Sequence, residues 1–235
     1  MATFQFDTIG IVHSPYKEKF AVPRQPGIVS SAKGQIELLP PYNDEHAIRD
    51  LEQFSHLWVL FVFHGTQDQG WKPLVRPPRL GGNTKTGVFS TRSTFRPNPI
   101  GMSVVSLEGI KQEGQRVFIE IAGMDLLDGT PVIDIKPYIP YSDSLPGAHA
   151  GYAADKPAAI MTVEFSAEAE SILHKLNDKH PHLKDFISDV LAQDPRPAYR
   201  NASTENRQYG VRLYDINVVW EVVDGTSRVI RIEEV

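Results

Sequence analysis

The side chains of this chain best suited to chemistry lie in the segment 91–103, which reads TRSTFRPNPIGMS. Two prolines flank Asn98, and each fixes φ and removes a backbone donor, so the segment is neither an ordinary helix nor a central strand. Gly101 permits the close approach of another group or a positive φ. Arg92, Arg96 and Asn98 therefore extend from a stiff backbone, as expected of a loop that binds a polyanionic ligand. The alternative is a surface turn whose arginines are solvated.

The charge of the surrounding sequence favours an anionic partner. The chain has a net charge of −5, yet no Asp or Glu lies between Asp68 and Glu108. An overall negative charge argues against a dedicated nucleic-acid binder. Binding to RNA nevertheless depends on local patches and counterion release, so RNA remains an acceptable partner. The cations of this stretch are Lys72, Arg76, Arg79, Lys85, Arg92 and Arg96.

Composition and motifs exclude several kinds of chemistry. The chain has no cysteine, which excludes disulfides, thiolate metal ligands and cysteine nucleophiles. Neither a dinucleotide-binding glycine motif nor a serine-hydrolase elbow is present. Residues 82–87 have the glycine spacing of a phosphate loop, but Val88 and Phe89 replace the required Lys and Ser/Thr. His180 and His182 could bind a metal, but they precede the second C-terminal helix and are interpreted as a helix entry, so we expect no metal.

The termini and hydropathy predict a cytoplasmic protein without a membrane segment. The first residues contain neither a basic region nor an apolar region of the kind found in signal peptides. The longest apolar run, Leu57–Phe63, is far shorter than the ~20 residues that span a bilayer.

The elements that must position the candidate loop are mainly strands. Alternating apolar and polar residues predict short strands joined by Gly- and Pro-rich connections, with a hairpin turn at Glu113-Gly114 and one helix at 44–53. This pattern predicts a mainly β fold, a closed or nearly closed β-barrel, and no Rossmann-type alternation of strands and helices. The predicted strands are Phe4–Val12, Gly34–Leu39, Leu57–Phe63, Gly87–Thr91, Ser103–Ile110, Arg116–Ala122 and Pro131–Tyr138.

A second, smaller unit is predicted after a linker. We place a β-barrel domain at 1–145, a linker at 146–160 and an α+β domain at 161–235. Ser166 is a suitable N-cap for a first helix, and the apolar stripe of 183–191 predicts a second helix. The predicted strands of this unit are Met161–Phe165, Gly210–Asp215, Asn217–Val222 and Ser227–Ile232.

Several ordered motifs give the chain a resemblance to a known family. Segment 91–103 resembles the signature of the TsaA-like family, whose bacterial members of this length are S-adenosylmethionine-dependent tRNA methyltransferases. Those enzymes methylate N6 of threonylcarbamoyladenosine 37 in the anticodon loop. The other matching blocks cover residues 1–140 and extend into the C-terminal part: SPYK at 14–17, PRQPG at 23–27, FSHLW at 54–58, FH at 63–64, DGTP at 128–131, DIKPY at 134–138 and DPRPAY at 194–199.

The resemblance implies that turns at strand ends form a pocket for S-adenosyl-L-methionine, partly across a homodimer interface. Such turns let the main chain approach a ligand closely. From the residues alone, each is equally well an ordinary hairpin turn, and His64 is equally well a strand cap. The implied cofactor-binding residues are Gln25, Pro26, Gly27, Phe63, His64, Arg92, Met102, Gly129, Thr130 and Pro131.

Methyl transfer needs few side chains, because it is an in-line displacement that depends on proximity and orientation. A base close to the acceptor N6 would assist. Asp134 is the candidate base, and an ion pair with Lys136 on the same strand face is the alternative. Asn98 is the candidate for holding N6 or the carbamoyl oxygen, and a turn residue bonded to its own backbone is the alternative.

The remaining candidates are residues expected to bind the substrate. Arg96 or Arg92 suits the threonyl carboxylate, and Arg92 equally suits the methionine carboxylate, because guanidinium binds carboxylate bidentately. Phe95, Tyr199 and Tyr209 are candidates for stacking on unpaired bases. Segment 194–200 is interpreted as an exposed basic contact for tRNA or, alternatively, as an interdomain tether. The residues assigned to substrate or tRNA are Arg96, Lys136, Tyr138, Arg196, Tyr199 and Arg200.

The sequence thus predicts an S-adenosylmethionine-dependent homodimer that methylates N6 of threonylcarbamoyladenosine 37 in tRNA. Two alternatives stay open at this point. One is a non-catalytic RNA-binding module, and the other is a methyltransferase that acts on a small molecule or a different RNA.

Overall fold

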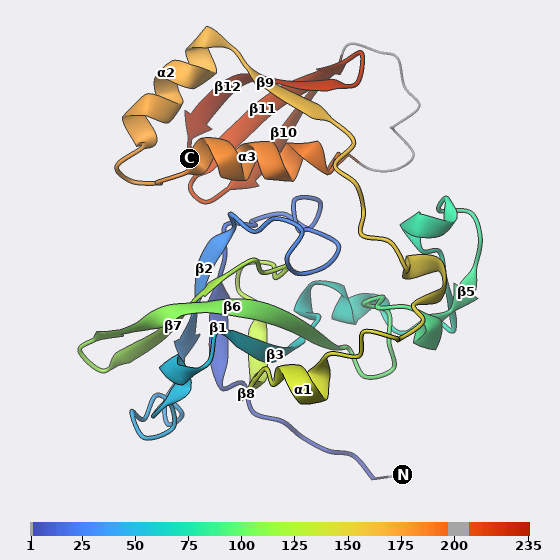
Figure 1. Cartoon of the computed structure of the whole chain (residues 1–235), viewed down its shortest axis with the longest axis vertical. Helices are drawn as coiled ribbons and strands as arrows, with labels where there is room; N and C mark the ends of the chain where they lie inside the picture. Colours follow the sequence, from blue (N-terminus) through green and yellow to red (C-terminus); the bar gives the residue numbers. More distant parts are fainter. Residues whose placement is uncertain (1, 197–206) are drawn as a thin grey trace. The chain divides into compact units, whose positions relative to one another are not determined.

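A computed structural model describes residues 2–196 and 207–235 (Figure 1). The chain forms two compact units. The first contains the residues up to His13 together with Gly34–Ala122 and Gly129–Lys156, and the second contains Ser14–Lys33, Gly123–Asp128 and Pro157–Val235. The sequence predicted that each domain is one continuous stretch of chain, with boundaries at 145 and 161. In the structure, Ser14–Lys33 and Gly123–Asp128 belong to the unit that contains the C-terminal residues.

The first unit is built on six strands, which pair in the order β1-β2-β7-β6-β3-β8 and close into a barrel. Neighbouring strands run antiparallel, for example β3 between β6 and β8. The prediction of a mainly β N-terminal part is confirmed. The strands are β1 (Gly10–His13), β2 (Lys33–Leu38), β3 (His56–Val62), β6 (Ile100–Glu113), β7 (Arg116–Ala122) and β8 (Pro131–Pro137).

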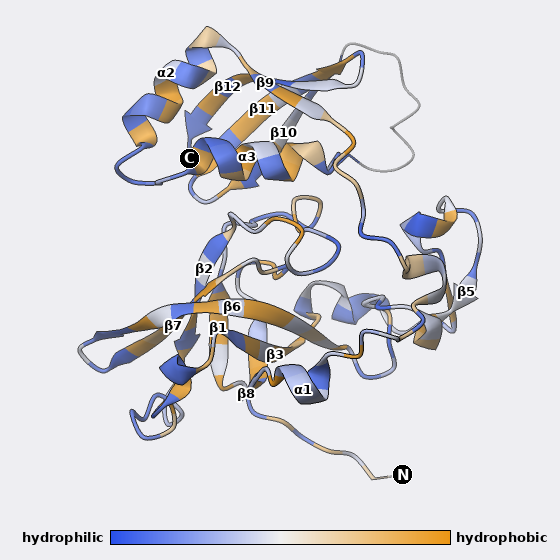
Figure 2. Ribbon diagram, in the orientation of Figure 1, coloured by the Kyte–Doolittle hydropathy of each residue, from blue (hydrophilic) through white to orange (hydrophobic). Residues whose placement is uncertain are grey.

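Alternation along these strands separates an apolar interior from an outer face. Val59, Phe61, Val105 and Val132 are buried, and apolar residues line these strands in Figure 2. Burying one such side chain contributes about 1.5–3 kcal/mol. Gly101 lies against Phe61, and a Cβ on this glycine would lie 2.3 Å from the ring. The predicted close approach at Gly101 is therefore confirmed.

Two predicted elements of this unit were wrong. The helix expected at 44–53 is a series of turns ending in the 3₁₀ helix η1 (Leu51–Gln53). Asp44 Oδ1 accepts a hydrogen bond from the His46 N–H, which competes with helix formation, and Ala47 is exposed rather than packed. The strand expected at Phe4–Val12 begins only at Gly10.

A third correction concerns the stretch rich in cations. We call residues 70–98 the cationic arm. Here the strand expected at Gly87–Thr91 is a two-residue strand, β5 (Thr86–Gly87), followed by the 3₁₀ helix η4 (Val88–Ser90). The other elements around the arm are η2 (His64–Gln69), β4 (Leu74–Val75), which pairs with β5, and η3 (Pro78–Leu80). The first unit ends with α1 (Pro140–Asp143) and η5 (Gly151–Ala153).

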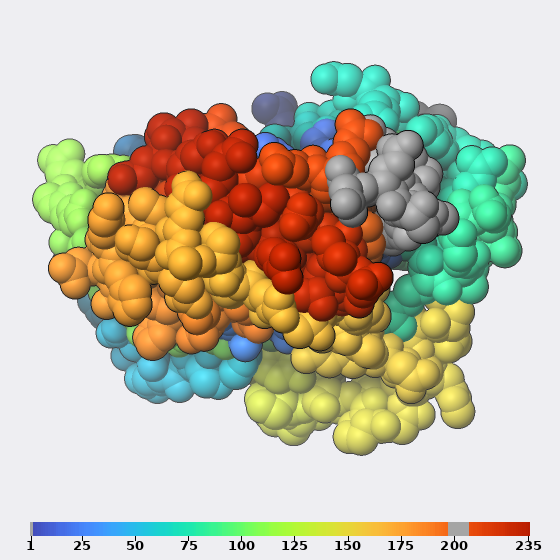
Figure 3. All heavy atoms as spheres, turned by 90° about the horizontal axis from the view of Figure 1, so that it is seen from above, coloured from blue at the N-terminus to red at the C-terminus, as the bar shows by residue number. Residues whose placement is uncertain are grey.

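The second unit is a four-stranded sheet with two helices. The strand order is β10-β11-β12-β9, with β9 parallel to β12 and the other pairs antiparallel. Helix α2 packs against β12 and β9, and α3 packs against β9. Side chains of this unit form a continuous surface in the orange and red part of Figure 3. The elements are β9 (Thr162–Phe165), α2 (Ala167–Leu176), α3 (Leu183–Ala192), β10 (Gln208–Leu213), β11 (Ile216–Val223) and β12 (Thr226–Glu234).

Local signals account for the helices of this unit. The Ser166 hydroxyl accepts a hydrogen bond from the Ala169 N–H at 3.1 Å, which confirms the predicted N-cap. The predicted stripe of α3 is buried along its length, from Leu183 to Leu191. Phe186 on this helix packs against Tyr16, whose ring centroid is 5.8 Å away. This contact explains why residues near Tyr16 belong to the second unit.

Candidate functional site

The register of three barrel strands brings two predicted site residues together. Leu60 of β3 pairs with Met102 of β6 on one side and with Asp134 of β8 on the other. Directly paired residues point to the same face of a sheet. The neighbours of Leu60 along β3 are buried, so Leu60, Met102 and Asp134 share the outer face of the barrel. We call these three residues the outer-face cluster. Met102 is 50% exposed and gives the cluster an apolar wall.

Asp134 forms the ion pair that was left open as the alternative to catalysis. Its Oδ2 lies 2.7 Å from Lys136 Nζ, and its Oδ1 accepts a hydrogen bond from the Ile135 N–H at 2.9 Å. Both charged side chains are well exposed, and such pairs contribute roughly 0–1 kcal/mol to stability. The pair therefore holds the carboxylate in place without making Asp134 essential for folding.

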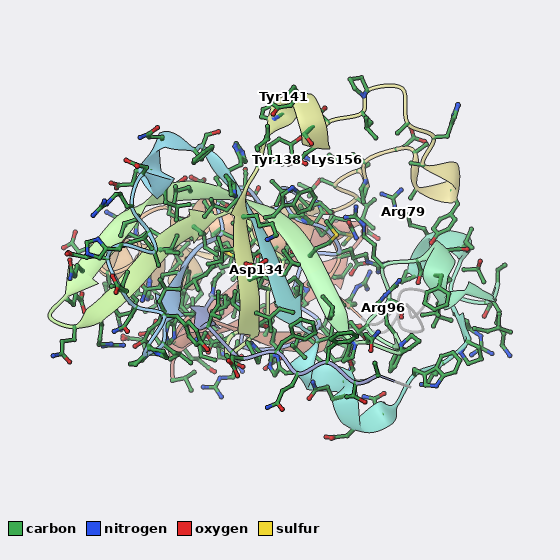
Figure 4. The ribbon with its side chains drawn as sticks, turned by 90° about the horizontal axis from the view of Figure 1, so that it is seen from below. Arg79, Arg96, Asp134, Tyr138, Tyr141 and Lys156 are labelled. Carbon is green, nitrogen blue, oxygen red and sulfur yellow. The ribbon has the colours of Figure 1, made fainter. Side chains whose placement is uncertain are left out.

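Tyr138 lies next to this pair in an aromatic cluster. Its ring centroid is 6.0 Å from that of Trp58 and 6.3 Å from that of His56. The Trp58 indole N–H donates to Asp143 of α1 at 2.9 Å. Figure 4 shows Tyr138 and Tyr141 near α1, whereas Arg96 lies in the cationic arm, well apart from Asp134 in this view.

A backbone hydrogen bond joins the end of β3 to the loop that contains Pro97 and Pro99, which we call the proline loop. The Phe63 N–H donates to the Pro99 carbonyl at 2.8 Å, and the Ile100 N–H donates to the Asn98 carbonyl at 2.7 Å. His64 follows as the first residue of η2. Three predicted site residues, Phe63, His64 and Asn98, are thereby brought to the same end of the barrel as Met102. Asn98 is exposed, and its carbonyl makes the local backbone contact expected of a turn residue.

Arg96 bonds to the backbone of its own loop, and its predicted contact with the substrate stays a prediction. Its Nη1 donates to the carbonyls of Val88 and Thr91, at 3.2 and 2.7 Å. The guanidinium thus holds the backbone of the arm, where the sequence predicted a contact with the substrate carboxylate. Arg92, four residues earlier, is exposed.

The loop before the prolines is stiffened by hydroxyl groups. Thr91 Oγ1 donates to the Val88 carbonyl at 2.8 Å and accepts from the Ser93 N–H at 3.1 Å. The Phe95 N–H in turn donates to Ser93 Oγ at 3.3 Å. Hydroxyl-to-backbone turns of this kind fix a loop that has no strand pairing.

The cationic arm presents its charges to solvent. Arg96 is half-buried, and the five other cations of the arm are exposed: Lys72, Arg76, Arg79, Lys85 and Arg92. The arm also exposes two aromatic side chains, Trp71 and Phe89, at 55% and 76%. Neither ring was predicted from the sequence to be a binding residue. The signal that could have revealed them is an aromatic residue in a stretch of cations with no strand or helix periodicity around it.

The turn after β7 and before β8 is tied to β1. Gly129 has a φ of 76°, and its N–H donates to the Val12 carbonyl at 2.8 Å. The Thr130 carbonyl accepts from the Val12 N–H, and Pro131 begins β8 opposite Ile11. Thr130 is buried, and the cofactor role predicted for Gly129, Thr130 and Pro131 stays a prediction.

The predicted cofactor residues of the second unit form a turn of their own. Gly27 has a φ of 71°, and its N–H donates to the Gly123 carbonyl at 2.8 Å. Gln25 donates to the neighbouring Arg24 carbonyl through its side-chain amide. Pro26 lies between them. The cofactor role of these three residues stays a prediction.

The basic segment expected at 194–200 requires a correction at Arg196. Its guanidinium forks onto Asp194, with Nε and Nη2 at 2.7 and 2.8 Å from the two carboxylate oxygens. The two side chains are only 8% and 5% exposed, so Arg196 is not the exposed tRNA contact that was predicted. The carboxylate raises the pKa of Arg196. Tyr199 and Arg200 lie outside the described residues, and Tyr209 packs on Trp220 with ring centroids 5.6 Å apart.

Two other kinds of feature are absent from the described part of the chain. Within residues 2–196 and 207–235, no helix is long and apolar enough to cross a membrane. In the same described ranges, no group of three or more His, Asp or Glu residues is arranged to hold a metal ion.

Comparison with known proteins matches both parts of the chain. Residues 11–144 match the family model of the tRNA-methyltransferase O N-terminal domain, and residues 158–235 match that of the TrmO C-terminal domain. A tRNA (adenine(37)-N6)-methyltransferase of Escherichia coli is 56% identical over 233 residues, covering 99% of each chain. A putative S-adenosylmethionine-dependent methyltransferase of Pseudomonas aeruginosa, RcsF, is 48% identical and covers 93% of this chain and 92% of its own.

A solved structure agrees with these sequence matches. The crystal structure of TrmO from Pseudomonas aeruginosa superimposes with a TM-score of 0.80 at 41% identity. The alignment covers 100% of this chain and 99% of the solved one.

Proposed function

Because the chain belongs to the tRNA-methyltransferase O family, we propose that it methylates N6 of threonylcarbamoyladenosine at position 37 of tRNA. The broader activity follows from family membership: the chain is an S-adenosylmethionine-dependent tRNA (adenine-N6)-methyltransferase. The alternative of a non-catalytic RNA-binding module is thereby set aside. The threonylcarbamoyl group as a requirement, the site residues and the assembly are the parts that we propose.

The observation that carries the proposed site is the register of β3, which places Met102 and Asp134 on either side of Leu60. A methyltransferase needs an apolar wall for a cofactor next to a polar group for the acceptor. Met102 supplies the first and Asp134 the second. The backbone bond from Phe63 to Pro99 places the proline loop at the same end of the barrel.

The chemistry of these residues fits S-adenosylmethionine. When bound, this cofactor supplies an electrophilic methyl group on a sulfonium. Met102 and Phe63 offer apolar surface for its adenine, and the exposed guanidinium of Arg92 suits its carboxylate. His64, at the start of η2, offers a ring nitrogen at the same barrel end. We propose that these four residues hold the cofactor.

On the acceptor side, we propose that Asp134 receives the proton that leaves N6 as the new N–CH₃ bond forms. Lys136 now holds this carboxylate, but its side chain is 63% exposed, so its ammonium is able to turn toward an RNA phosphate. Such a turn releases Asp134 for the acceptor. Asn98 orients the carbamoyl oxygen through its amide, and Tyr138 packs beside the acceptor base.

The cationic arm supports a nucleic-acid substrate. No carboxylate lies between its exposed cations in the sequence, so the phosphates of an RNA backbone would be attracted to Lys and Arg side chains along the whole arm. We further propose that two copies of the chain associate and that the enzyme works in the cytoplasm. The exposed apolar side chains of Ile100 and Met102 on the outer face support a homodimer.

The test uses labelled S-adenosylmethionine and two tRNA pools, one from normal cells and one lacking threonylcarbamoyladenosine. Mass spectrometry of nuclease digests locates the methyl group. Label confined to threonylcarbamoyladenosine of the normal pool is the expected result. Label on an unmodified adenosine, or on another nucleoside of either pool, would show a different acceptor, and labelling of a small molecule alone would remove tRNA as the substrate.

A further inference from the structure

The turn η4 in the cationic arm is held from several sides. The Val88 carbonyl accepts from Thr91 Oγ1 and from Arg96 Nη1, and Arg96 Nη1 also reaches the Thr91 carbonyl. The Ser90 carbonyl accepts from the hydroxyl of Tyr152 at 3.0 Å. Val88 itself is buried. The backbone on both sides of Phe89 is therefore fixed although it belongs to no long strand or helix.

Phe89 is the residue that this rigid turn presents. Its side chain is 76% exposed, while the residue before it is buried. A ring exposed in this way leaves most of its apolar surface in contact with water. A rigid aromatic side chain does, however, offer a large contact area at a low entropic cost of binding.

The surroundings of the ring indicate what it binds. The guanidinium of Arg96 lies 5.8 Å from the Phe89 ring centroid. Lys72 lies 4.1 Å from the centroid of the half-buried Phe95 ring, and the Lys72 backbone N–H donates to the Phe95 carbonyl. The exposed rings of the arm are Phe89 and Trp71. Exposed aromatic rings interleaved with cations are the combination that binds single-stranded nucleic acid, with bases stacked on the rings and phosphates near the cations.

We propose that the Phe89 ring is a stacking platform for an unpaired base of the tRNA anticodon loop. This inference rests on the proposed function, because it assumes a tRNA substrate. Position 37 belongs to a single-stranded loop, whose bases can be splayed and stacked on aromatic side chains. Arg96 is then a positioning residue, which holds the turn that carries the ring.

The experiment measures the Kd of fluorescein-labelled native tRNA for the full chain by anisotropy. Phe89→Ala is expected to raise the Kd roughly 5- to 150-fold, the range seen when a base-stacking side chain is removed. Phe89→Trp is expected to bind like the wild type. Phe4→Ala is the matched control, since Phe4 is 79% exposed but lies far from the arm in sequence, and it is expected to change nothing.

Salt dependence separates stacking from charge. The Kd ratio of Phe89→Ala to wild type is expected to be the same at about 50 and 200 mM salt, because stacking releases no counterions. Arg96→Lys is expected to raise the Kd for tRNA when Phe89 is present. In the Phe89→Ala variant, Arg96→Lys is expected to raise the Kd no further. A contribution of Arg96 that does not depend on Phe89, such as a direct contact with a phosphate, would weaken both equally and would overturn its positioning role.

Failure of the stacking platform can be distinguished from failure of the proposed function. An unchanged Kd for Phe89→Ala, in a protein that methylates threonylcarbamoyladenosine normally, would overturn the platform and leave the proposed function intact. A wild-type protein without activity on tRNA would overturn the proposed function itself. A variant with normal tRNA affinity but an altered sedimentation coefficient, or altered binding of S-adenosylmethionine, would assign the ring to a second copy or to the cofactor and overturn the platform.

Discussion

The cationic arm and residues 194–196 of the second unit place basic side chains in opposite environments. In the arm, Lys72 and Arg92 are exposed, and the sequence contains no carboxylate from 69 to 107. In the second unit, Arg196 is buried against Asp194 two residues away. The arm therefore offers charges that no neighbouring carboxylate in the sequence neutralises, whereas the charge of Arg196 is neutralised by Asp194. The Asp194–Arg196 pair is placed to stabilise the fold, and the exposed charge of the arm supports the proposed binding of an anionic ligand.

The largest effect expected from this contrast is on stability. Asp194→Asn keeps the side-chain size and the left-handed backbone (φ 49°) but leaves Arg196 buried without its counter-charge. We expect a loss of about 3 kcal/mol in the free energy of unfolding, measured by urea denaturation. Arg92→Ala in the arm is the control and should change stability by less than about 0.5 kcal/mol. Equal effects at both positions would remove the distinction between the two regions.

The next effect concerns turnover. Asp134→Asn should lower kcat by roughly 10²-fold or more, as expected for loss of a general base, with little change in cofactor affinity. Glu113→Gln is a matched control, because Glu113 pairs with Lys111 on the same strand at 2.6 Å in the same two-residue spacing. It should leave kcat unchanged. Unfolding of Asp134→Asn, seen by circular dichroism, would instead assign the carboxylate a structural role.

A smaller effect is expected where the barrel positions the proline loop. Gly101→Ala places a Cβ 2.3 Å from the Phe61 ring and should cost about 1–3 kcal/mol of stability. Phe61→Leu should relieve this clash, so the double variant should lose less than the sum of the two single variants. Additive losses in thermal unfolding would show that the ring is not the group that requires glycine.

The smallest effect concerns acid stability, and it compares one carboxylate in each unit. The Arg116 guanidinium and then His13 lower the pKa of Glu37 from 4.5 to about 2, and Lys179 and then His180 lower that of Asp215 from 3.8 to about 2. A lowered folded-state pKa stabilises above the unfolded pKa, and this stability is lost as the pH falls toward 2. Because the pairs are partly exposed, each contributes less than about 1 kcal/mol.

Glu37→Gln and Asp215→Asn should each flatten the loss of stability between about pH 4.5 and pH 2. Urea denaturation at several acid pH values measures the slope for each variant and for the wild type. A slope as steep as that of the wild type in both variants would contradict these two shifts.

Sequence periodicity predicted the regular elements well. The strand Arg116–Ala122 was predicted with its observed bounds, and the stripe of α3 was predicted residue by residue. The prediction of a helix at 44–53 was wrong because the periodicity of apolar residues does not indicate the hydrogen bond to Asp44. Nor does it indicate that no surface is present, in the described part of the chain, on which Ala47 could be buried. Long, half-buried elements leave a pattern in the sequence, and short capped turns do not.

The site was predicted in part for the same reason. Segment 91–103 was identified from its residue types, but its contacts were not, since Arg96 binds carbonyls that no spacing rule indicates. The pairing of Met102 and Asp134 with Leu60 depends on strand register, which the sequence does not specify by itself. Phe89 was missed because a strand was expected where a turn exposes its ring.

The interleaving of the two units has a consequence for synthesis on the ribosome. All the strands of the barrel have been made once Pro137 has been added, so this unit is able to close early. Tyr16, made before most of the barrel, is fully buried, and it packs against Phe186 and pairs with Leu213, which are made after the barrel. Segment 14–33 therefore cannot complete its packing until the last strands have been synthesised, and until then its apolar side chains are exposed to water. We expect nascent chains of this protein to need protection over that interval.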